Sequence, residues 1–469
     1  MSFESLLERA EASSVDLDLN DRYDGTRQLD SLGLNIPPVT RVLEMATTWP
    51  QLVVDTMAEV LVVEGFECAA EGTDPFLKRV WELWAASNMG VSAYLAQVEA
   101  LVQGSSFLIV GLDRGGRVFT TVRSRGGVAV DYVDGRVASA LVRYQATTEQ
   151  GTTVERATYY TGTTIETFQQ AGGLWGKLES ASAPGYVPVV PLVNKYRVGD
   201  TAGRSEISLV SGFADAAARA LTLLQLSMEL LSMPQRWIAG GDMSKFKRAD
   251  GTSPTLADLY LGSYMFAPTA DAKMGQFPGA DLSQIVNVIE TLARQVSATT
   301  GIPMQMFGFT SAGNPMSAEA MRAAKERFIS RGERKQALFG EAYTQWARIA
   351  LAYDAVARGR RVDIGRLDES LSGLEVAWRD IAFPSVAAKN QAVLQAHAQG
   401  IVSGRTAREQ LPLTVQQKRR EDMADAAEGD VIMRAAGKRA SFKQAPAFKD
   451  DPDAVTAGNE DKAAVKGGL

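Results

Sequence analysis

Apolar and polar positions follow two different periods along the chain, and these periods separate helical from strand-rich stretches. Residues 2–12, 40–62 and 75–103 place apolar side chains three and four positions apart, which predicts helices. Pro50 interrupts the second stretch and predicts a kink or a restart of the helix. Residues 105–179 consist instead of short runs rich in Val, Thr and Tyr, separated by Gly and Asp-Gly, which predicts an antiparallel meander of hairpins.

Three long helices are expected in the middle of the chain. Residues 205–233 contain no Pro and carry two apolar stripes, which predicts a helix that is buried on most of its circumference. A second helix is expected over residues 281–299, where Asp281 is in position to act as its N-cap. The third is expected to start at Asn314-Pro315, a typical N-cap and first helical residue, and to run to about Arg358.

The remaining segments are shorter. Residues 235–280 read as a small insert with strand-like pieces, and shorter helices are expected over 385–399, 404–411 and 414–436. The residues from 446 onward lack apolar periodicity, which predicts a disordered tail. The order of these elements predicts an α+β protein with several folding units.

Composition excludes several classes of protein. The 469 residues are 45% hydrophobic and 22% charged, which is typical of a folded protein, and the net charge of −6 argues against a tight grip on DNA phosphates. A single cysteine, Cys68, and a single histidine, His397, exclude an internal disulfide and a zinc site built from Cys and His. The chain shows neither an apolar run long enough to span a membrane nor a secretory signal at its start, so no membrane partner is expected.

Candidate chemistry is sparse. The stretch AGGLWGKLE at 171–179 resembles a phosphate-binding loop, but Ala171 replaces its first glycine and Leu178 replaces the residue that would hold Mg²⁺, so a glycine-rich hairpin is the better interpretation. His397 near a helix end and Cys68 in a strand-like stretch are interpreted as structural. We therefore expect no enzyme, no catalytic residue, no cofactor and no metal site.

One charged pattern stands out on the third long helix. The pattern consists of Arg327 and of Arg331, Arg334 and Lys335, which follow it by four, seven and eight positions. This spacing places all four on one face of a helix. Two interpretations remain open from the spacing. The residues form either a solvated face whose charges are paired within the chain, or a basic surface that meets an acidic neighbouring subunit or nucleic acid.

Several phrases, in this order, resemble one known family. They are RYDGTRQLDSLGL (22–34), TTWPQLVVDTMAEVLVVEGF (47–66), PVVPLVN (188–194), GRSEISLV (203–210), LLSMPQRWIAG (230–240), TTGIPMQMFGF (299–309) and GNPMSAEAMRAAKERFISRGERKQALFG (313–340). Together they resemble the portal, or head-to-tail connector, proteins of long-tailed bacteriophages, and most closely those of phages that infect actinobacteria. The resemblance spans about residues 20–430.

The resemblance implies a portal-like multidomain subunit with long stem helices, an antiparallel β meander in a wing, a small α/β clip and a helical crown. The implied parts are a wing over 1–200 (meander 105–179), a first stem helix over 201–233, a clip over 234–280, a second stem helix over 281–305, a tunnel loop over 306–316, a long helix returning to the wing over 317–384, a crown over 385–445 and a disordered tail over 446–469.

The resemblance also implies which residues serve which part. The tunnel loop would contain Phe307, Gly308, Phe309, Thr310, Ser311, Ala312, Gly313 and Asn314. The stem would pack through Phe213, Leu221, Leu224, Met228, Ile285, Ile289 and Leu292. The apolar stripes of residues 205–233 agree with this assignment, because such a helix needs neighbours on several sides.

By the same resemblance, the protein would form a ring of twelve subunits at one capsid vertex, through which double-stranded DNA passes without specific binding during packaging and ejection. Its partners would be further copies of itself, the major capsid protein, the terminase packaging motor and a head-completion (adaptor) protein. It would reside in the virion, and in the host cytoplasm during assembly. Two other interpretations stay open: a phage capsid-associated adaptor without a DNA channel, and a hydrolase with an unfamiliar site.

Overall fold

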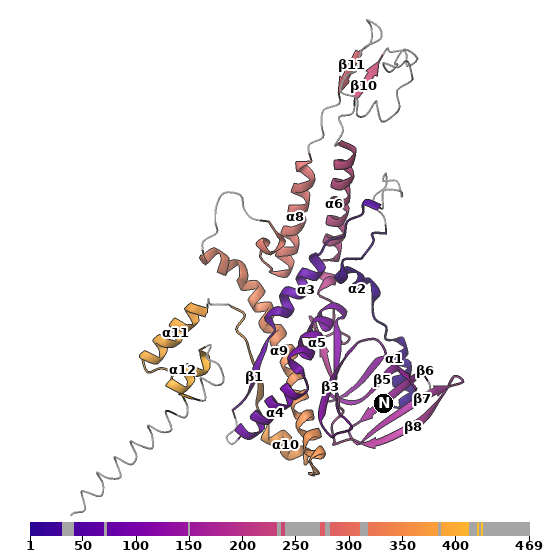
Figure 1. The fold of residues 1–469 in the computed structure, drawn as a ribbon, viewed down its shortest axis with the longest axis vertical. Coiled ribbons are helices and arrows are strands. Elements are labelled where there is room, and N and C mark those ends of the chain that lie inside the picture. Colours follow the sequence, from indigo (N-terminus) through magenta and orange to yellow (C-terminus); the bar gives the residue numbers. More distant parts are fainter. Residues whose placement is uncertain are drawn as a thin grey trace, which may run out of the picture. The chain divides into compact units, whose positions relative to one another are not determined.

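The chain divides into two units, Met1–Ala382 and Phe383–Leu469, which are described separately (Figure 1). The computed structural model describes residues 1–30, 42–69, 73–148, 151–231, 236–239, 273–276, 282–309, 318–382 and 386–411, and residues 420, 421 and 424. The expected helix at 414–436 and the expected tail therefore lie almost entirely outside the described residues, as does most of the insert at 235–280.

The first unit mixes helices with antiparallel sheets, as the sequence predicts. Its helices are α1 (Phe3–Ala12), α2 (Leu17–Asp24), α3 (Trp49–Val60), α4 (Asp74–Ala86), α5 (Met89–Gln103), α6 (Ser211–Leu231), α8 (Ser283–Thr300), α9 (Ala318–Ala357) and α10 (Ile364–Ser370). Two 3-10 turns, η2 (Ile207–Leu209) and η4 (Met304–Phe307), precede α6 and follow α8. Pro50 stands in the first turn of α3, so it begins this helix and does not kink it. The helix expected over 40–62 therefore covers only 49–60, and residues 44–48 before it are not helical.

The strands among the described residues form four sheets. They are β1 (Val63–Cys68), β2 (Ser105–Leu112), β3 (Val118–Ser124), β4 (Val128–Val133), β5 (Arg136–Thr147), β6 (Thr153–Thr161), β7 (Thr164–Ala171), β8 (Leu174–Ser182), β9 (Val189–Val193), β10 (Arg236–Ala239), β11 (Lys273–Gln276) and β12 (Leu374–Trp378). Strands β4 to β8 pair in sequence order, which confirms the predicted meander for that stretch. Strands β2 and β3 belong to a separate sheet, in which β2 pairs with β9 on its other edge.

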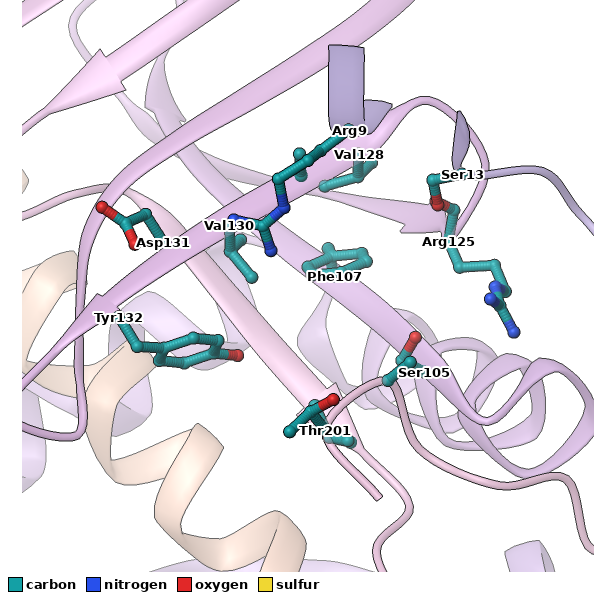
Figure 2. A pocket seen from close by; sticks show the side chains of 13 residues that line it. Arg9, Ser13, Ser105, Phe107, Arg125, Val128, Val130, Asp131, Tyr132 and Thr201 are labelled. Carbon is teal, nitrogen blue, oxygen red and sulfur yellow. The ribbon is translucent and has the colours of Figure 1, made fainter. Parts of the chain in front are cut away.

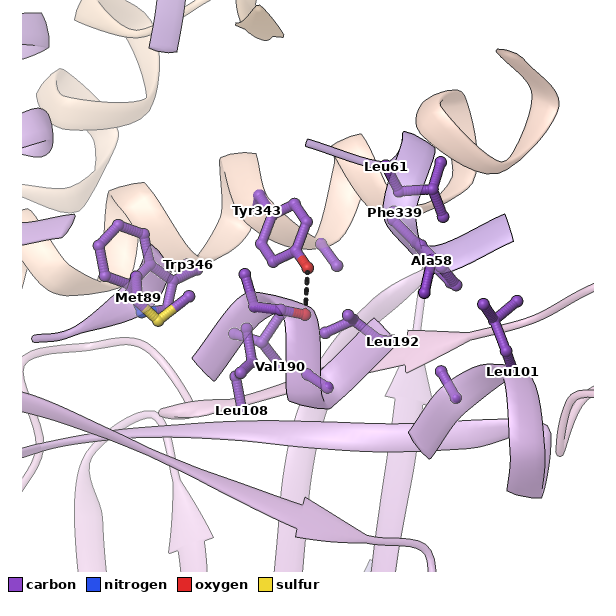
Figure 3. Close-up of a cluster of buried hydrophobic side chains, with 14 of the residues drawn as sticks. Ala58, Leu61, Met89, Leu101, Leu108, Val190, Leu192, Phe339, Tyr343 and Trp346 are labelled. Atoms are coloured by element: carbon purple, nitrogen blue, oxygen red, sulfur yellow. Dashed lines mark hydrogen bonds between the residues drawn. The ribbon is translucent and has the colours of Figure 1, made fainter. Parts of the chain in front are cut away.

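Helix α9 carries the core of this unit. Its buried aromatic residues Phe339, Tyr343 and Trp346 face α5 and strands β2 and β9 (Figure 3). Tyr343 accepts a hydrogen bond from Gln97 Nε2 (3.0 Å) and donates one to a carbonyl of α5, so its hydroxyl is satisfied inside the core. Trp84 of α4 meets the rings of Tyr343 and Trp346 edge-on, at centroid distances of 5.5 and 5.2 Å.

Strand β1 closes the unit by pairing with a strand from its far end. Residues 63–68 run antiparallel to residues 374–378 in β12, and Cys68 lies opposite Leu374. The Cys68 thiol donates a hydrogen bond to the carbonyl oxygen of Ser372 (3.3 Å). The pairing ties α3 and α4, which flank β1, to the segment that follows α9.

The structure corrects three expectations about helices. The predicted helix at 75–103 is two helices, α4 and α5, because Asn88 between them has a left-handed backbone (φ 54°). Helix α2 was not predicted: its Asp16 N-cap and the left-handed Gly25 at its end look like turn residues in the sequence. Helix α6 begins at Ser211 rather than at 205, because the preceding residues belong to a buried contact described below.

The second unit contains α11 (Val386–Ala398) and α12 (Gly404–Gln410) among its described residues. His397 lies in the last turn of α11, as the sequence predicts. Its Nδ1 is 3.2 Å from the carbonyl oxygen of Val402. Ser403 caps α12 by accepting a hydrogen bond from the backbone N–H of Thr406 (3.1 Å).

Gly301 ends α8 and lets the chain turn into η4 close to the backbone of α9. It ends α8 in a left-handed conformation (φ 77°), and a Cβ at this position would lie 2.9 Å from the backbone nitrogen of Phe328 on α9. Both the conformation and the space therefore require glycine. Gly359, which follows α9, has a similar φ of 70° but nothing within 4 Å of a Cβ.

These two glycines give a matched test. Gly359→Ala should lower the free energy of unfolding by about 1 kcal/mol, the strain of a left-handed alanine. Gly301→Ala should cost at least about 1–2 kcal/mol more, because α8 and α9 must also move apart. Urea unfolding followed by circular dichroism measures both. Equal losses for the two variants would show that α8 and α9 do not need their close approach.

Candidate functional site

Helices α6 and α8 pack against each other (Figure 1), and both leave apolar side chains exposed to solvent. Near its start α6 buries small residues, among them Ala214 and Ala217, while further along Leu223 and Met228 are exposed. On α8 the buried positions are Ile289, Ala293 and Val296, and the exposed ones include Val286 and Val288, at 46% and 51% exposure. A helix pair with apolar residues on its outer surface needs further neighbours to bury them.

The residues that the sequence assigned to stem packing all lie on these two helices. Phe213 is half-buried against the main core and Ile289 is buried. Leu221, Leu224, Ile285 and Leu292 are half-buried, and Met228 is 52% exposed. Sequence reasoning missed the exposed Leu223, Val286 and Val288, which apolar periodicity alone could not distinguish from core residues.

A buried carboxylate, Glu206, holds the start of α6 against α9. Its two oxygens each contact a cation of α9: Oε2 lies 2.6 Å from Arg331 Nη2, and Oε1 lies 2.8 Å from Lys335 Nζ. Lys335 also donates a hydrogen bond to the side chain of Asn194, and its Nζ lies 4.0 Å from the ring centroid of Tyr196. We call these five residues the Glu206 cluster.

The Glu206 cluster joins four segments of the chain. Asn194 follows β9 and donates to the carbonyl of Arg204 (2.7 Å), so it fixes the loop that leads into η2. Arg331 donates to the carbonyl of Thr299 at the end of α8 (3.1 Å). The β9 loop, η2, α8 and α9 are therefore held at one point, at the end of α8 and shortly before the start of α6.

Burial and charge act in opposite directions on these groups. Burial alone would raise the pKa of Glu206, but the charges of Lys335 and Arg331 outweigh it and hold the pKa below its ordinary value. Burial lowers the pKa of Lys335, and Glu206 opposes that change. Neutralising Glu206 would leave both cations buried without a counter-charge, and neutralising both cations would leave the carboxylate buried without one.

A second ion pair fixes α6 from another side. Arg22 of α2 is 9% exposed and contacts Asp215 through two nitrogens, at 2.6 and 3.1 Å. Its Nε also donates to Asp18 (2.6 Å). Because the contact is bidentate, it fixes the orientation of α6 relative to α2 and also holds the two helices together.

The basic pattern predicted on α9 does not form one exposed face. Arg331 and Lys335 turn inward to Glu206, with side chains 11% and 5% exposed. Arg327 and Arg334 remain exposed. The spacing was read correctly as helical, but the sequence did not show that Glu206 would be buried against two of the four cations.

The expected tunnel loop, 306–316, is described only over residues 306–309. Phe307 is buried and meets Trp49 edge-on at 6.0 Å, and Phe309 is half-buried against the main core. Gly308 between them is left-handed (φ 82°). Thr310, Ser311, Ala312, Gly313 and Asn314 lie outside the described residues. The two aromatic residues of this stretch thus contact the core, and the assignment of residues 306–316 to a tunnel loop stays a prediction.

The cavities bear on whether the chain could hold a catalytic site. One, of about 460 Å³, is lined by Arg9, Arg125, Phe107 and neighbouring residues of β4 (Figure 2). Its lining combines two arginines and Asp131 with apolar and hydroxyl side chains and includes no His or Cys. Over the described part of the chain, no group of three or more His, Cys, Asp and Glu could hold a metal, and no helix is long and apolar enough to cross a membrane. The glycine-rich stretch at 171–179 is the β7–β8 hairpin.

Comparison with known proteins identifies the class. The family model described as "Phage portal protein, SPP1 Gp6-like" matches residues 19–431. The chain therefore belongs to the family of bacteriophage portal proteins, the structural connectors between phage head and tail.

The relatives narrow the identification. The portal protein of Mycobacterium phage L5 is 33% identical over 445 residues, covering 91% of this chain and 89% of the relative. That of Mycobacterium phage D29 is 33% identical over 427 residues, covering 87% and 85%. Both relatives come from phages named for an actinobacterial host, so the resemblance drawn from the sequence phrases is confirmed.

Solved structures of gene transfer agent particles also match. A chain in the neck of the native particle, computed with C12 symmetry, gives a TM-score of 0.42 at 15% identity and covers 88% of this chain and 99% of that one. A chain in the virion of the native particle gives 0.41 at 16% identity, covering 84% and 100%.

The Glu206 cluster predicts a large loss of stability on neutralisation. Glu206→Gln keeps the shape of the side chain but leaves Arg331 and Lys335 buried without a counter-charge, which should cost about 3–5 kcal/mol. Adding Lys335→Met should recover part of that loss, because one of the two unpaired cations is then gone. Urea unfolding of the two variants and the parent measures the effect.

Glu82→Gln serves as the control, because Glu82 pairs with Arg79 at a half-exposed position (2.8 Å). Its loss should stay within about 1 kcal/mol. If Glu206→Gln were no more destabilising than Glu82→Gln, the Glu206 cluster would not be holding the helices together.

Proposed function

We propose that twelve copies of this chain form a ring at one capsid vertex, through whose channel double-stranded DNA is packaged and ejected. Membership of the portal family over residues 19–431 carries the proposal. The apolar residues that α6 and α8 leave in solvent support it, because neighbouring subunits would bury them. The net charge of −6 per chain fits a channel wall that DNA must slide past.

Within this ring, α6 and α8 are the two stem helices, and the insert at 234–280, of which β10 and β11 are described, is the clip. The sheets and helices of residues 1–200 form the wing, to which 317–384 returns through α9, α10 and β12. Residues 385–445, which include α11 and α12, form the crown. Residues 306–316 supply the tunnel loop, anchored at its first end by Phe307 and Phe309.

The proposed partners are those of a connector. Further copies of the chain form the ring, the major capsid protein surrounds it, and the terminase motor and a head-completion protein dock in turn. DNA passes without sequence-specific contacts. The protein assembles in the host cytoplasm and acts as a structural part of the virion rather than as an enzyme. A capsid-associated adaptor without a channel would show no central hole in negative-stain images of the purified protein.

The exposed apolar residues of the stem give the sharpest test of self-association. Met228→Asp and Val288→Asp change side chains that are 52% and 51% exposed in the single chain, so each variant should fold normally. In a ring the same changes would bury a charge between subunits, which should abolish rings. Multi-angle light scattering and negative-stain images should show small species. Leu221→Asp should do the same, but its half-buried position also affects the fold.

Leu174→Asp is the matched control, because Leu174 lies on β8, outside the stem, and is 78% exposed. It should leave the rings intact. Full rings from Met228→Asp and Val288→Asp would remove α6 and α8 from the subunit contacts.

The proposed tunnel loop predicts a defect in DNA transport without a defect in assembly. Thr310→Trp should leave ring size unchanged and lower the DNA content of heads, because a bulky side chain would narrow the channel. The conservative Thr310→Ser should package normally. Gly308→Pro is a poorer test, since proline cannot adopt the φ of 82° found there. In vitro packaging with heads of equal portal content gives the readout, and normal DNA content with Thr310→Trp would remove the loop from the channel.

A further inference from the structure

Five arginines surround a hollow at the far end of α9. The hollow has a volume of about 710 Å³ and lies between α4, the end of α9 and α10. Its charged lining consists of Arg79, Arg358, Arg360, Arg361 and Arg366 with Asp354 and Asp363. Glu82 also pairs with Arg79 from outside the lining, so five cations against three carboxylates leave two positive charges in excess, on a chain whose net charge is negative.

The charges of this hollow are unevenly paired. Arg79 grips Asp354 through two nitrogens, at 2.6 and 3.0 Å, and Arg358 reaches the same carboxylate at 3.1 Å. Within the described residues, neither Arg360 nor Arg361 has an ion-pair partner, and both are exposed. The hollow therefore has a fixed inner wall, made by the Asp354 contacts, and two free guanidinium groups at its edge.

Apolar side chains complete the lining. Leu351 is buried, Val362 and Leu367 are half-buried, and Phe76 is 38% exposed. A cavity of this size holds a few side chains, and its mixture of apolar and cationic groups fits a ligand with both characters. Arginine also binds carboxylates bidentately, which makes it well suited to acidic side chains.

We propose that this hollow binds an acidic peptide segment of a partner protein, with one apolar side chain seated against Leu351 and Leu367 and carboxylates held by Arg360 and Arg361. Duplex DNA fits less well, because it presents a convex phosphate surface without an apolar group to fill the cavity. The end of α9 accounts for some positive charge through its carbonyl groups, but five arginines around one cavity exceed what a helix end requires.

The proposal is tested with the full-length protein and a fluorescein-labelled peptide, Glu-Glu-Phe-Glu-Glu, by fluorescence anisotropy. Arg360→Glu with Arg361→Glu should weaken binding at least about tenfold, a loss of about 1.4 kcal/mol. A peptide with Ser in place of Phe should also bind several-fold more weakly. A duplex DNA of about 20 base pairs should not displace the Phe peptide at equal charge concentration.

Lys177→Glu with Arg197→Glu reverses two exposed charges outside the hollow and serves as the control. It should leave binding unchanged, and thermal melting should confirm that both double variants are folded. The proposal is overturned if the variant at 360 and 361 binds like the parent, or if the Ser peptide and the duplex bind as well as the Phe peptide. The second result would mark a general polyanion surface.

Discussion

The arrangement of the larger unit depends on a single buried carboxylate. Glu206 is the anion that the inward-facing cations of α9 require, and those cations in turn contact α8 and the loop after β9. Hydrophobic packing could press these segments together in several registers, since it has little directional preference. Ion pairs with fixed hydrogen-bond geometry allow one register. The position of the helix pair relative to the sheets is therefore set by these ion pairs together with Ala293 and Val296 of α8, which pack into the core around α9.

This division of roles explains why the helix pair can be apolar on its outer surface. If only hydrophobic contacts held the helices, the exposed Met228 and Val288 could pack against the core in place of the residues that are buried there. The Glu206 cluster and the Arg22–Asp215 pair hold the inner ends of the helices. The outer residues then remain available for neighbouring subunits, without a cost to the fold of the single chain.

Sequence reasoning predicted elements that follow from a local periodic pattern and missed those that depend on a contact between distant residues. The hairpins between β4 and β8, the end of α9 near Arg358 and the start of α3 at Trp49-Pro50 follow from local patterns, and the structure agrees. The predicted start of α9 at Asn314-Pro315 lies outside the described residues. The left-handed Asn88 that separates α4 from α5, and the pairing of β1 with β12, depend on long-range packing that no local pattern encodes. The same holds for the site: the spacing placed Arg331 and Lys335 on a helix, but only the fold showed Glu206 between them. The family resemblance rested on many short phrases and was independent of these errors.

The pairing of β1 with β12 has a consequence for the timing of synthesis. The strand at 63–68 leaves the ribosome early, yet its partner at 374–378 emerges only after most of the chain has been made. During that interval β1 has an open edge, and the core around α9 lacks its central helix. Folding of the first unit is thus completed after translation of residue 378, at the cost of closing a very long loop. A subunit cut short before that point would lack both the strand partner and a finished core, so incomplete chains would be excluded from assembly by their own failure to fold.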